Sequence, residues 1–360
     1  MRIVVTGGGT GGHVYPALEV AKAAVSEGQE VRYLGSLRGI ERSACEHAGV
    51  SFTGYPSSPI PRLVSPAGLV SAYRILRSSA AVRQDLKKWK PDVVLSMGGY
   101  AASPVLTAAR WMRLPLVLHE QNSVPGRTNL MAAGAARKVC IVFAEAEAYF
   151  PGKSVVTGMP IRSGLLDVVR HAAGRETFFT LSYGGSQGSA ALNEAILTMA
   201  AQVGTQDLTW LQITGPKLFE EVAKALERVC APPNFQARAF LQADEIAAAY
   251  ERADLAIVRS GCGTITELAS FGVPAIFVPL PQAYANHQYH NAKAIEGIGG
   301  GEVLLQKDLT PESLRAAWQG WRSDAERRRQ AADALQAWSR RDGTQRVLSV
   351  VKEVANAVKI

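Results

Sequence analysis

The chain has 360 residues, 47% hydrophobic and 19% charged, a composition typical of a globular protein with a large core, which excludes a disordered chain. The length favours two domains, and no apolar run reaches the about 18 residues that a membrane-spanning helix needs. The net charge of +8 comes entirely from residues 1–160, which hold 18 Lys and Arg against 10 Asp and Glu, whereas residues 161–360 hold 21 of each. The first half is therefore suited to an anionic partner, such as a phosphorylated substrate, a nucleic acid or an acidic membrane.

The N-terminus and the cysteines indicate a cytoplasmic chain. The sequence enters an apolar strand at once, without the charged leader, apolar core and cleavage site of a signal peptide, so we expect an unprocessed N-terminus. The four cysteines are scattered and show no CxxC spacing: Cys45, Cys140, Cys230 and Cys262. We expect buried thiols rather than a zinc site or a disulfide framework.

The first predicted strand leads into a glycine-rich loop. An apolar run, Ile3 to Val5, is followed by five glycines in the six positions from Gly7 to Gly12, and a helical pattern begins behind them. A strand, a glycine loop and a helix N-terminus together suit a phosphate group. His13 lies at the start of this helix, and its place beside the loop makes it a candidate functional residue.

Two common functions of such a loop are disfavoured. A dinucleotide-binding fold needs an acidic residue near the end of the second strand to hold the ribose, but the segment 31–39 ends without one and Glu41 comes late. A P-loop needs Lys and then Ser or Thr after Gly12, where this chain has His13 and Val14. The loop therefore predicts a phosphate-bearing ligand other than NAD or a P-loop nucleotide.

Residues 62–90 are basic and amphipathic, with seven basic residues against one acidic residue, Asp85. Apolar residues recur at helical spacing: Leu69, Val70, Tyr73, Leu76, Ala80 and Leu86. Composition alone slightly favours packing of such a helix on the core over contact with an anionic membrane surface. The excess positive charge of the first half is one argument for the membrane. Nucleic acid is disfavoured because aromatic residues are not interleaved with the basic ones, as base stacking would require.

A second strand, glycine loop and helix start follow far downstream. Phe179 to Tyr183 form the expected strand and Gly184 to Gly188 the loop. Apolar strands alternate with amphipathic helices on both sides, which predicts two similarly built α/β domains with parallel sheets. The Pro- and Gly-rich segment 150–165 is the expected linker, and the tail from Asp342 onward is expected to be helical.

Residues near the second loop can bind a nucleotide. The Ser186 hydroxyl and the loop amides suit an oxyanion, and Arg162 in the linker can reach a diphosphate with its bidentate fork. Downstream, Gly263 and Thr264 open a helix, and Glu267 lies in its first turns. A carboxylate there can accept hydrogen bonds from both hydroxyls of a ribose.

Seven motifs occur in a specific order. They are GGTGGH, GGY, HEQN, GMPIR, GGSQG, RSG followed by Thr and Glu, and NHQYHNA. From residue 7 to about residue 292, this combination resembles the MurG family of peripheral-membrane transferases, which add N-acetylglucosamine to the undecaprenyl-linked peptidoglycan precursor lipid I and make lipid II. The resemblance implies an α/β chain of GT-B architecture, with two Rossmann-like, doubly wound parallel-sheet domains facing across a cleft. It implies an acceptor- and membrane-binding domain at residues 1–160, with the C-terminal helix 342–360 packed on it, and a UDP-sugar-binding domain at residues 161–341.

The resemblance also implies the site residues. The donor-binding positions are Thr10, Gly11, Gly12, Asn122, Arg162, Ser186, Leu241, Gly263, Thr264, Glu267 and Gln288, with Asn291 close by. Among them, Ser186 and Arg162 would meet the diphosphate and Glu267 the ribose. The backbone of Leu241 would meet uracil, and Gln288 would hold the sugar hydroxyls. The acceptor-binding positions are Gly8, Gly9, Gly98, Gly99, Tyr100 and His119. Two positions depart from the common pattern: Met159 stands where Asn is frequent, and His287 where some members carry Gln.

The implied reaction is an inverting transfer of N-acetylglucosamine from its UDP derivative to the C4 hydroxyl of the muramoyl pentapeptide of lipid I. It serves peptidoglycan synthesis, and with it cell shape and division, at the cytoplasmic face of the cell membrane. A base must take the acceptor proton, and His13 and Glu120 both remain candidates. We expect the loop Gly7 to Gly12 to cradle the acceptor diphosphate.

The sequence also bears on cofactors and on alternative functions. It has no Asp-x-Asp motif, so we expect no metal and no cofactor, with the UDP-sugar as co-substrate. The alternative is a soluble GT-B relative, such as a UDP-N-acetylglucosamine 2-epimerase or a small-acceptor glycosyltransferase. A binding module without turnover is the non-enzymatic alternative.

Overall fold

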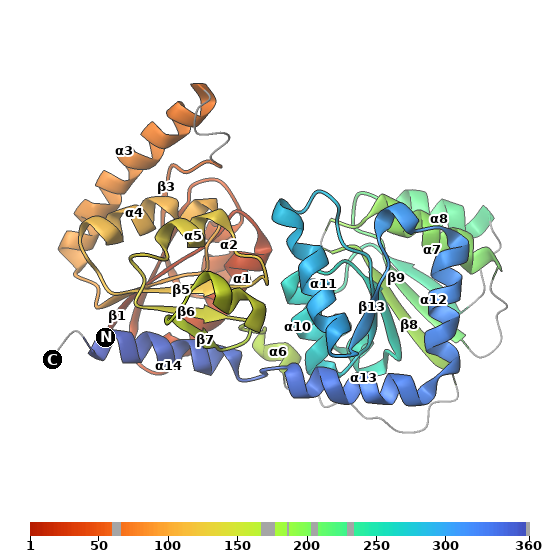
Figure 1. The fold of residues 1–360 in the computed structure, drawn as a ribbon. Helices are drawn as coiled ribbons and strands as arrows, with labels where there is room; N and C mark the ends of the chain where they lie inside the picture. Colours follow the sequence, from red (N-terminus) through yellow and green to blue (C-terminus); the bar gives the residue numbers. More distant parts are fainter. Residues whose placement is uncertain (60–65, 167–176, 186, 203–207, 229–233, 358–360) are drawn as a thin grey trace. The chain divides into compact units, whose positions relative to one another are not determined.

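The computed structural model describes residues 1–59, 66–166, 177–185, 187–202, 208–228 and 234–357. The chain divides into two compact units, shown in Figure 1: unit 1 comprises Met1–Arg162 and Arg340–Ile360, and unit 2 comprises Ser163–Ser339. The boundary expected after residue 160 lies two residues before the observed division. Both units are α/β with wholly parallel sheets, which confirms the predicted fold class.

Unit 1 is built on a seven-stranded parallel sheet in the order β3-β2-β1-β4-β5-β6-β7. The strands are β1 (Arg2–Thr6), β2 (Glu30–Ser36), β3 (Ser51–Tyr55), β4 (Val93–Ser96), β5 (Leu116–Glu120), β6 (Lys138–Ile141) and β7 (Ser154–Val156). They read as apolar runs because both faces of the sheet are covered by helices. The order reverses at β1, which pairs with β2 on one side and β4 on the other.

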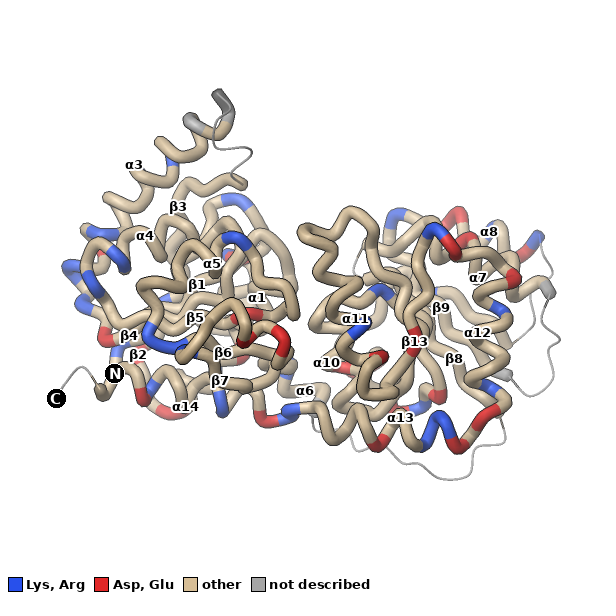
Figure 2. Tube along the Cα trace, in the orientation of Figure 1, with Lys and Arg blue, Asp and Glu red and all other residues tan. Residues whose placement is uncertain are grey.

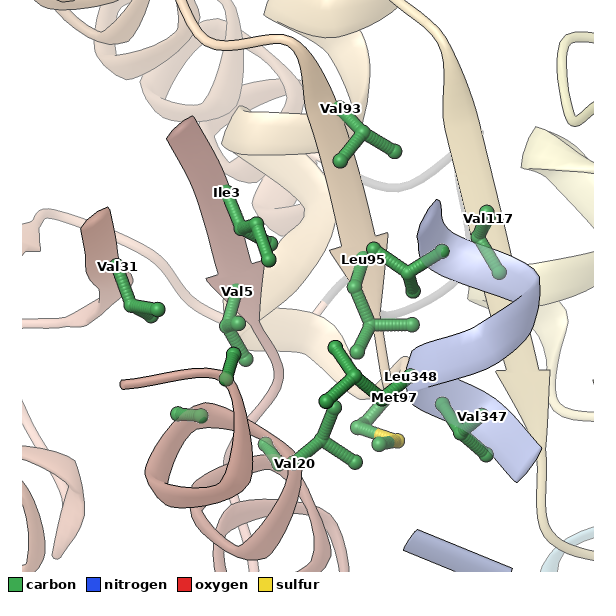
Figure 3. Close-up of a cluster of buried hydrophobic side chains, with 14 of the residues drawn as sticks. Ile3, Val5, Val20, Val31, Val93, Leu95, Met97, Val117, Val347 and Leu348 are labelled. Atoms are coloured by element: carbon green, nitrogen blue, oxygen red, sulfur yellow. The ribbon is translucent and has the colours of Figure 1, made fainter. Parts of the chain in front are cut away.

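The helices of unit 1 lie on two faces of this sheet. They are α1 (Gly11–Ser26), α2 (Glu41–His47), α3 (Pro66–Trp89), α4 (Ser103–Trp111), α5 (Arg127–Ala132) and α14 (Gly343–Asn356), with short 3₁₀ turns at Tyr100–Ala102 and Ala144–Tyr149. Figure 3 shows one face, where side chains of β1, β2, β4 and β5 meet α1 and the C-terminal helix α14. On the other face, Val4 belongs to the cluster that packs against α3 and α4.

Unit 2 repeats this plan with six parallel strands in the order β10-β9-β8-β11-β12-β13. The strands are β8 (Phe178–Tyr183), β9 (Leu208–Ile213), β10 (Phe235–Arg238), β11 (Leu255–Val258), β12 (Ala275–Phe277) and β13 (Gly301–Val303). The helices are α6 (Ser163–Leu166), α7 (Ala190–Gln202), α8 (Phe219–Arg228), α9 (Ala243–Arg252), α10 (Cys262–Phe271), α11 (His287–Gly297), α12 (Pro311–Ser323) and α13 (Ala325–Trp338), with 3₁₀ turns at Tyr284–Asn286 and Gln306–Asp308. The core includes Trp210, Trp318 and Trp321, which are all fully buried.

Three details refine the expectations from sequence. The segment 150–165, expected to be a linker, contributes the edge strand β7 and the start of α6. Of the apolar residues expected on one face of α3, Leu86 lies in the core, whereas Val70, Tyr73 and Leu76 are exposed. Along the described part of the chain, no helix combines the length and the apolarity that crossing a bilayer requires.

Candidate functional site

The first glycine loop lies at the point where the strand order of unit 1 reverses, which is where open α/β sheets bind ligands. The loops that follow β1 and β4 touch there. Gly98 and Gly99 have φ values of 81° and 77°, and a Cβ at Gly99 would overlap the carbonyl oxygen of Gly8. The ring of Tyr100 covers Gly9 so closely that a Cβ at Gly9 would overlap it. The structure therefore brings five of the six predicted acceptor-binding residues together.

A buried carboxylate lies against this loop. Glu41, the first residue of α2, has no exposed surface, and its Oε1 accepts a hydrogen bond of 3.0 Å from the Gly9 amide. A Cβ at Gly8 or Gly39 would overlap the same carboxylate. Sequence reasoning dismissed Glu41 because it follows the second strand too late to hold a ribose. The sequence did hold one indication: Glu41 begins the helix after β2, and β2 pairs with β1, the strand that leads into the glycine loop.

His13 lies in the first turn of α1. Its Nδ1 is 3.0 Å from Oγ1 of Thr10, the N-cap residue, and its ring is half-buried. No side chain caps the N-terminus of α1, and Thr10 and Gly12 are exposed. The helix therefore presents a partial positive charge and a titratable ring at one exposed edge of the loop.

Glu120, at the end of β5, is 2% exposed and fully engaged by its own loop. Its Oε1 accepts from the backbone amide of Asn122 at 2.9 Å and from the Asn122 side chain at 3.4 Å. Its Oε2 accepts from the Gly126 amide at 3.1 Å and from Asn129 Nδ2 at 2.8 Å. Burial raises the pKa of Glu120, and these four N–H donors oppose that shift. Because each carboxylate oxygen accepts about two hydrogen bonds, both are filled.

His119 is the buried neighbour of Glu120. Its side chain has no exposed surface, and its Nε2 is 3.0 Å from the carbonyl oxygen of Gly158. Burial, aided by the nearby His13, lowers the pKa of His119 to about 4 despite that hydrogen bond. His119 therefore lies beneath the predicted acceptor surface. Next along the chain, Gln121 donates from Nε2 to the carbonyl of Gly12 at 2.8 Å, which ties the β5 loop to the first glycine loop.

The second glycine loop lies at the equivalent strand reversal of unit 2, after β8. Gly188 has a φ of 77°, and a Cβ there would overlap the carbonyl oxygen of Thr214, so the loop needs glycine for this close approach. Ser186, the predicted diphosphate contact, lies outside the described residues.

Arg259 is a buried guanidinium close to this loop, and it is 7% exposed. It donates to the carbonyl oxygens of Val278 and Pro279, to Ser189 Oγ at 2.7 Å and to Gln306 Oε1 at 2.6 Å. Burial lowers the pKa of Arg259. These four hydrogen-bond acceptors are all uncharged, and through them the arginine joins the start of α7 to the loops after β12 and β13.

The N-terminus of α10 and Glu267 form the rest of the described donor region. The N-cap Gly261 has no side chain to cap the helix, and a Cβ at Gly263 would meet nothing within 4 Å. Thr264 and Glu267 are half-exposed. The carboxylate of Glu267 accepts a hydrogen bond of 2.8 Å from the hydroxyl of Tyr250, which is itself 2.8 Å from the hydroxyl of Tyr183.

The two tyrosines are buried, and sequence reasoning missed them. Tyr250 stands at helical spacing among core residues of α9, so nothing in the pattern separates it from an ordinary core tyrosine. The contact with Glu267 joins α9 and α10 and exists only in the folded chain.

The remaining predicted donor residues are placed as follows. Leu241 is 9% exposed and directly precedes the capping box of α9, which Gln242 and Glu245 form. Gln288 accepts from the Leu280 amide at 3.0 Å, and the neighbouring Asn291 is fully buried. Arg162 is half-exposed at the end of the first segment of unit 1.

Family models match both units. The glycosyltransferase family 28 N-terminal domain matches residues 3–141, and the C-terminal domain of the same family matches residues 180–347. The chain is 33% identical to a UDP-N-acetylglucosamine–N-acetylmuramyl-(pentapeptide) pyrophosphoryl-undecaprenol N-acetylglucosamine transferase of Bacillus licheniformis, and the match covers 100% of both chains. A transferase of the same name from Desulfitobacterium hafniense is 34% identical over 99% of this chain and 100% of its own.

A solved structure agrees with these relatives. The crystal structure of Acinetobacter baumannii MurG matches with a TM-score of 0.81 and 31% identity, over 98% of this chain and 99% of that chain. The chain is thus a glycosyltransferase, and it belongs to the MurG family within glycosyltransferase family 28.

Proposed function

We propose that this enzyme transfers N-acetylglucosamine from UDP-N-acetylglucosamine to the C4 hydroxyl of the N-acetylmuramoyl pentapeptide of lipid I, giving lipid II in peptidoglycan synthesis. The observation that carries this proposal is the identity of 33–34%, over the full length of the chain, with transferases named for these two substrates. In this assignment unit 2 binds the UDP-sugar and unit 1 binds the undecaprenyl-linked acceptor.

The donor end of the reaction follows from the chemistry of unit 2. A diphosphate suits the loop after β8 and the uncapped N-terminus of α10, because backbone amides and the helix dipole both favour an anion there. Glu267, oriented by Tyr250, accepts from the ribose hydroxyls. The backbone amides of the loop and of the α10 N-terminus stabilise the negative charge that develops on the departing UDP. In this proposal Arg162 and Ser186 add to that stabilisation.

We assign the role of base to His13 rather than Glu120. The four hydrogen bonds to the Glu120 carboxylate come from N–H donors, three in the loop after β5 and one from Asn129 of α5, and they leave no lone pair for an acceptor hydroxyl. His13 is half-buried at the edge of the glycine loop, and histidine is the most common general base in enzymes. Its Nδ1 contacts Oγ1 of Thr10, and in this proposal its ring takes the proton from the acceptor C4 hydroxyl.

The acceptor lies in the cytoplasmic leaflet of the cell membrane, and α3 suits contact with that leaflet. Val70, Tyr73 and Leu76 are 48–65% exposed on its N-terminal half, and Trp111 on the neighbouring α4 is 46% exposed. Figure 2 shows a cationic segment within α3 and further cationic segments near its C-terminal end. Exposed apolar side chains with flanking cations are the features of a helix that binds an anionic membrane surface. This surface supports a peripheral enzyme and not a nucleic-acid partner.

The test is the release of UDP from UDP-N-acetylglucosamine, measured with and without a soluble lipid I analogue and in the presence of EDTA. We expect release only with the acceptor and at an unchanged rate in EDTA, because the proposed chemistry uses no metal. Release or epimerisation without the acceptor would instead indicate a soluble relative of the epimerase kind, and no turnover would indicate a binding module. Dependence on an added divalent ion would contradict the metal-free mechanism.

A further inference from the structure

Unit 1 contains a cavity of about 270 Å³ between α3, α4 and α5, and the proposed transfer reaction does not use it. Its walls are mostly apolar, and they include Ile75, Leu106, Leu116 and Ala132. Ile75, Leu106 and Leu116 are at most 7% exposed, so their side chains form a fixed wall and not a loose surface. A dry, apolar space of this kind favours a hydrocarbon over water.

Tyr100 joins this cavity to the first glycine loop. It lines the cavity, and its ring also covers Gly9 on the loop. A ligand that lies on the loops after β1 and β4 can therefore continue past Tyr100 into the cavity. The ligand that fits has a polar end on the glycine loops and an apolar end between the helices.

Two arginines also line the cavity. Arg110 on α4 and Arg127 at the start of α5 are both exposed, and among the residues that the structure describes neither has an ion-pair or hydrogen-bond partner. Two unpaired guanidinium groups beside an apolar cavity complement an anionic amphiphile, and arginine pairs with phosphate through its bidentate fork.

The volume sets the length of chain that the cavity can hold. A cavity of ~150 Å³ takes up one benzene, which has six carbons. The 270 Å³ observed here therefore holds roughly ten carbons on that scale, which is two isoprene units. A full undecaprenyl chain is much longer, so the rest of it would stay in the bilayer.

We propose that this cavity binds the two isoprene units next to the diphosphate of the polyprenyl-linked acceptor, while Arg127, at the start of α5, holds the diphosphate. The inference rests on the proposed function, since it concerns the same acceptor. It makes the cavity a specificity site that separates a prenyl diphosphate acceptor from a soluble sugar diphosphate.

The test measures direct binding to the full chain by titration calorimetry, without detergent or bilayer. The probes are geranyl diphosphate, with ten carbons in two isoprene units, and methyl diphosphate, which has the same charge and no chain. We expect geranyl diphosphate to bind at least about tenfold more tightly, because the difference is the burial of nine carbons. Equal affinities would overturn the inference. Equally tight binding of dihexanoyl phosphatidylglycerol would assign the cavity to membrane phospholipid and would also overturn it.

Two matched variants localise the effect. Thr107→Trp fills the cavity from α4 and should remove the preference for the geranyl chain, whereas Leu130→Trp adds the same side chain at an exposed position that does not line it. Met131→Ser, at a 66% exposed position of the wall, cannot unfold the helix and should reduce the preference about threefold. The site is refuted if the preference for geranyl over methyl diphosphate persists in Thr107→Trp. It is also refuted if Leu130→Trp removes that preference as completely as Thr107→Trp does. Transfer to lipid I by the same wild-type preparation separates this failure from a failure of the proposed function.

Discussion

The substitution Glu120→Gln separates a carboxylate that holds a loop from one that takes a proton. Glutamine keeps one acceptor oxygen, but its NH₂ group then faces two of the four N–H donors that now bind Glu120. Hydrogen bonds to a charged group contribute about 1.5–3 kcal/mol each, so the loss of two lowers the free energy of unfolding of unit 1 by roughly 3–6 kcal/mol. At about 2–4 °C per kcal/mol for a domain of this size, the midpoint of thermal unfolding falls by roughly 6–24 °C.

The assay combines thermal unfolding, followed by circular dichroism, with kcat measured well below the midpoint of the variant. His13→Asn is the comparator, because His13 is only half-buried and its replacement should cost little stability. We expect His13→Asn to keep the unfolding midpoint within about 2 °C and to lose about 10²–10⁴-fold in kcat, the range of general-base catalysis. The reasoning is refuted if Glu120→Gln keeps its midpoint while kcat falls as far as in His13→Asn.

Three further predictions follow from single contacts. Tyr250→Phe removes the hydroxyl that orients Glu267, so KM for the UDP-sugar should rise about three- to tenfold at a nearly constant kcat; an unchanged KM would show that this hydrogen bond does not matter. His119 has a folded pKa of about 4 against about 6.5 unfolded, so below pH 6.5 the unfolded chain binds the extra proton and stability falls by about 3 kcal/mol by pH 4. His119→Gln should flatten that slope in pH-dependent denaturation, and an equally steep slope would contradict the assignment. Gly99→Ala should destabilise by more than about 1 kcal/mol because of its positive φ and the facing carbonyl, whereas Gly134→Ala, in open space, should not; equal denaturation midpoints would oppose this.

The fold could be predicted because its determinants are local in the sequence. Each unit begins with an apolar strand, a glycine loop and a helix, and this order alone predicts a parallel sheet that binds ligands at its carboxyl edge. Gly98 and Gly99 were predicted from the family resemblance, and the structure brings them to the first glycine loop because β4 pairs with β1. The helical tail from Asp342 followed from its apolar spacing, and α14 packs in the core of unit 1.

The contacts that orient the candidate site could not be predicted, because they join elements that are distant in the sequence. The bond from Tyr250 to Glu267 joins two helices, and the four donors to Glu120 depend on the path of one irregular loop. Glu267 and Glu120 were both predicted as candidate site residues from their motifs. Only the structure separates a half-exposed carboxylate, Glu267, from one whose oxygens are already filled, Glu120.

The two glycine loops share one topology but differ in charge, and this difference bears on where the acceptor diphosphate lies. Beneath the first loop, the Glu41 carboxylate accepts a hydrogen bond from the Gly9 amide. Its negative charge lowers the affinity of that part of the loop for an anion. Beside the second loop, the buried charged group is the guanidinium of Arg259, which favours an anion. The first loop is therefore better suited to sugar hydroxyls near His13 than to a diphosphate. In the proposed assignment the acceptor diphosphate lies beyond Tyr100, at Arg127, where unit 1 offers positive charge beside an apolar cavity.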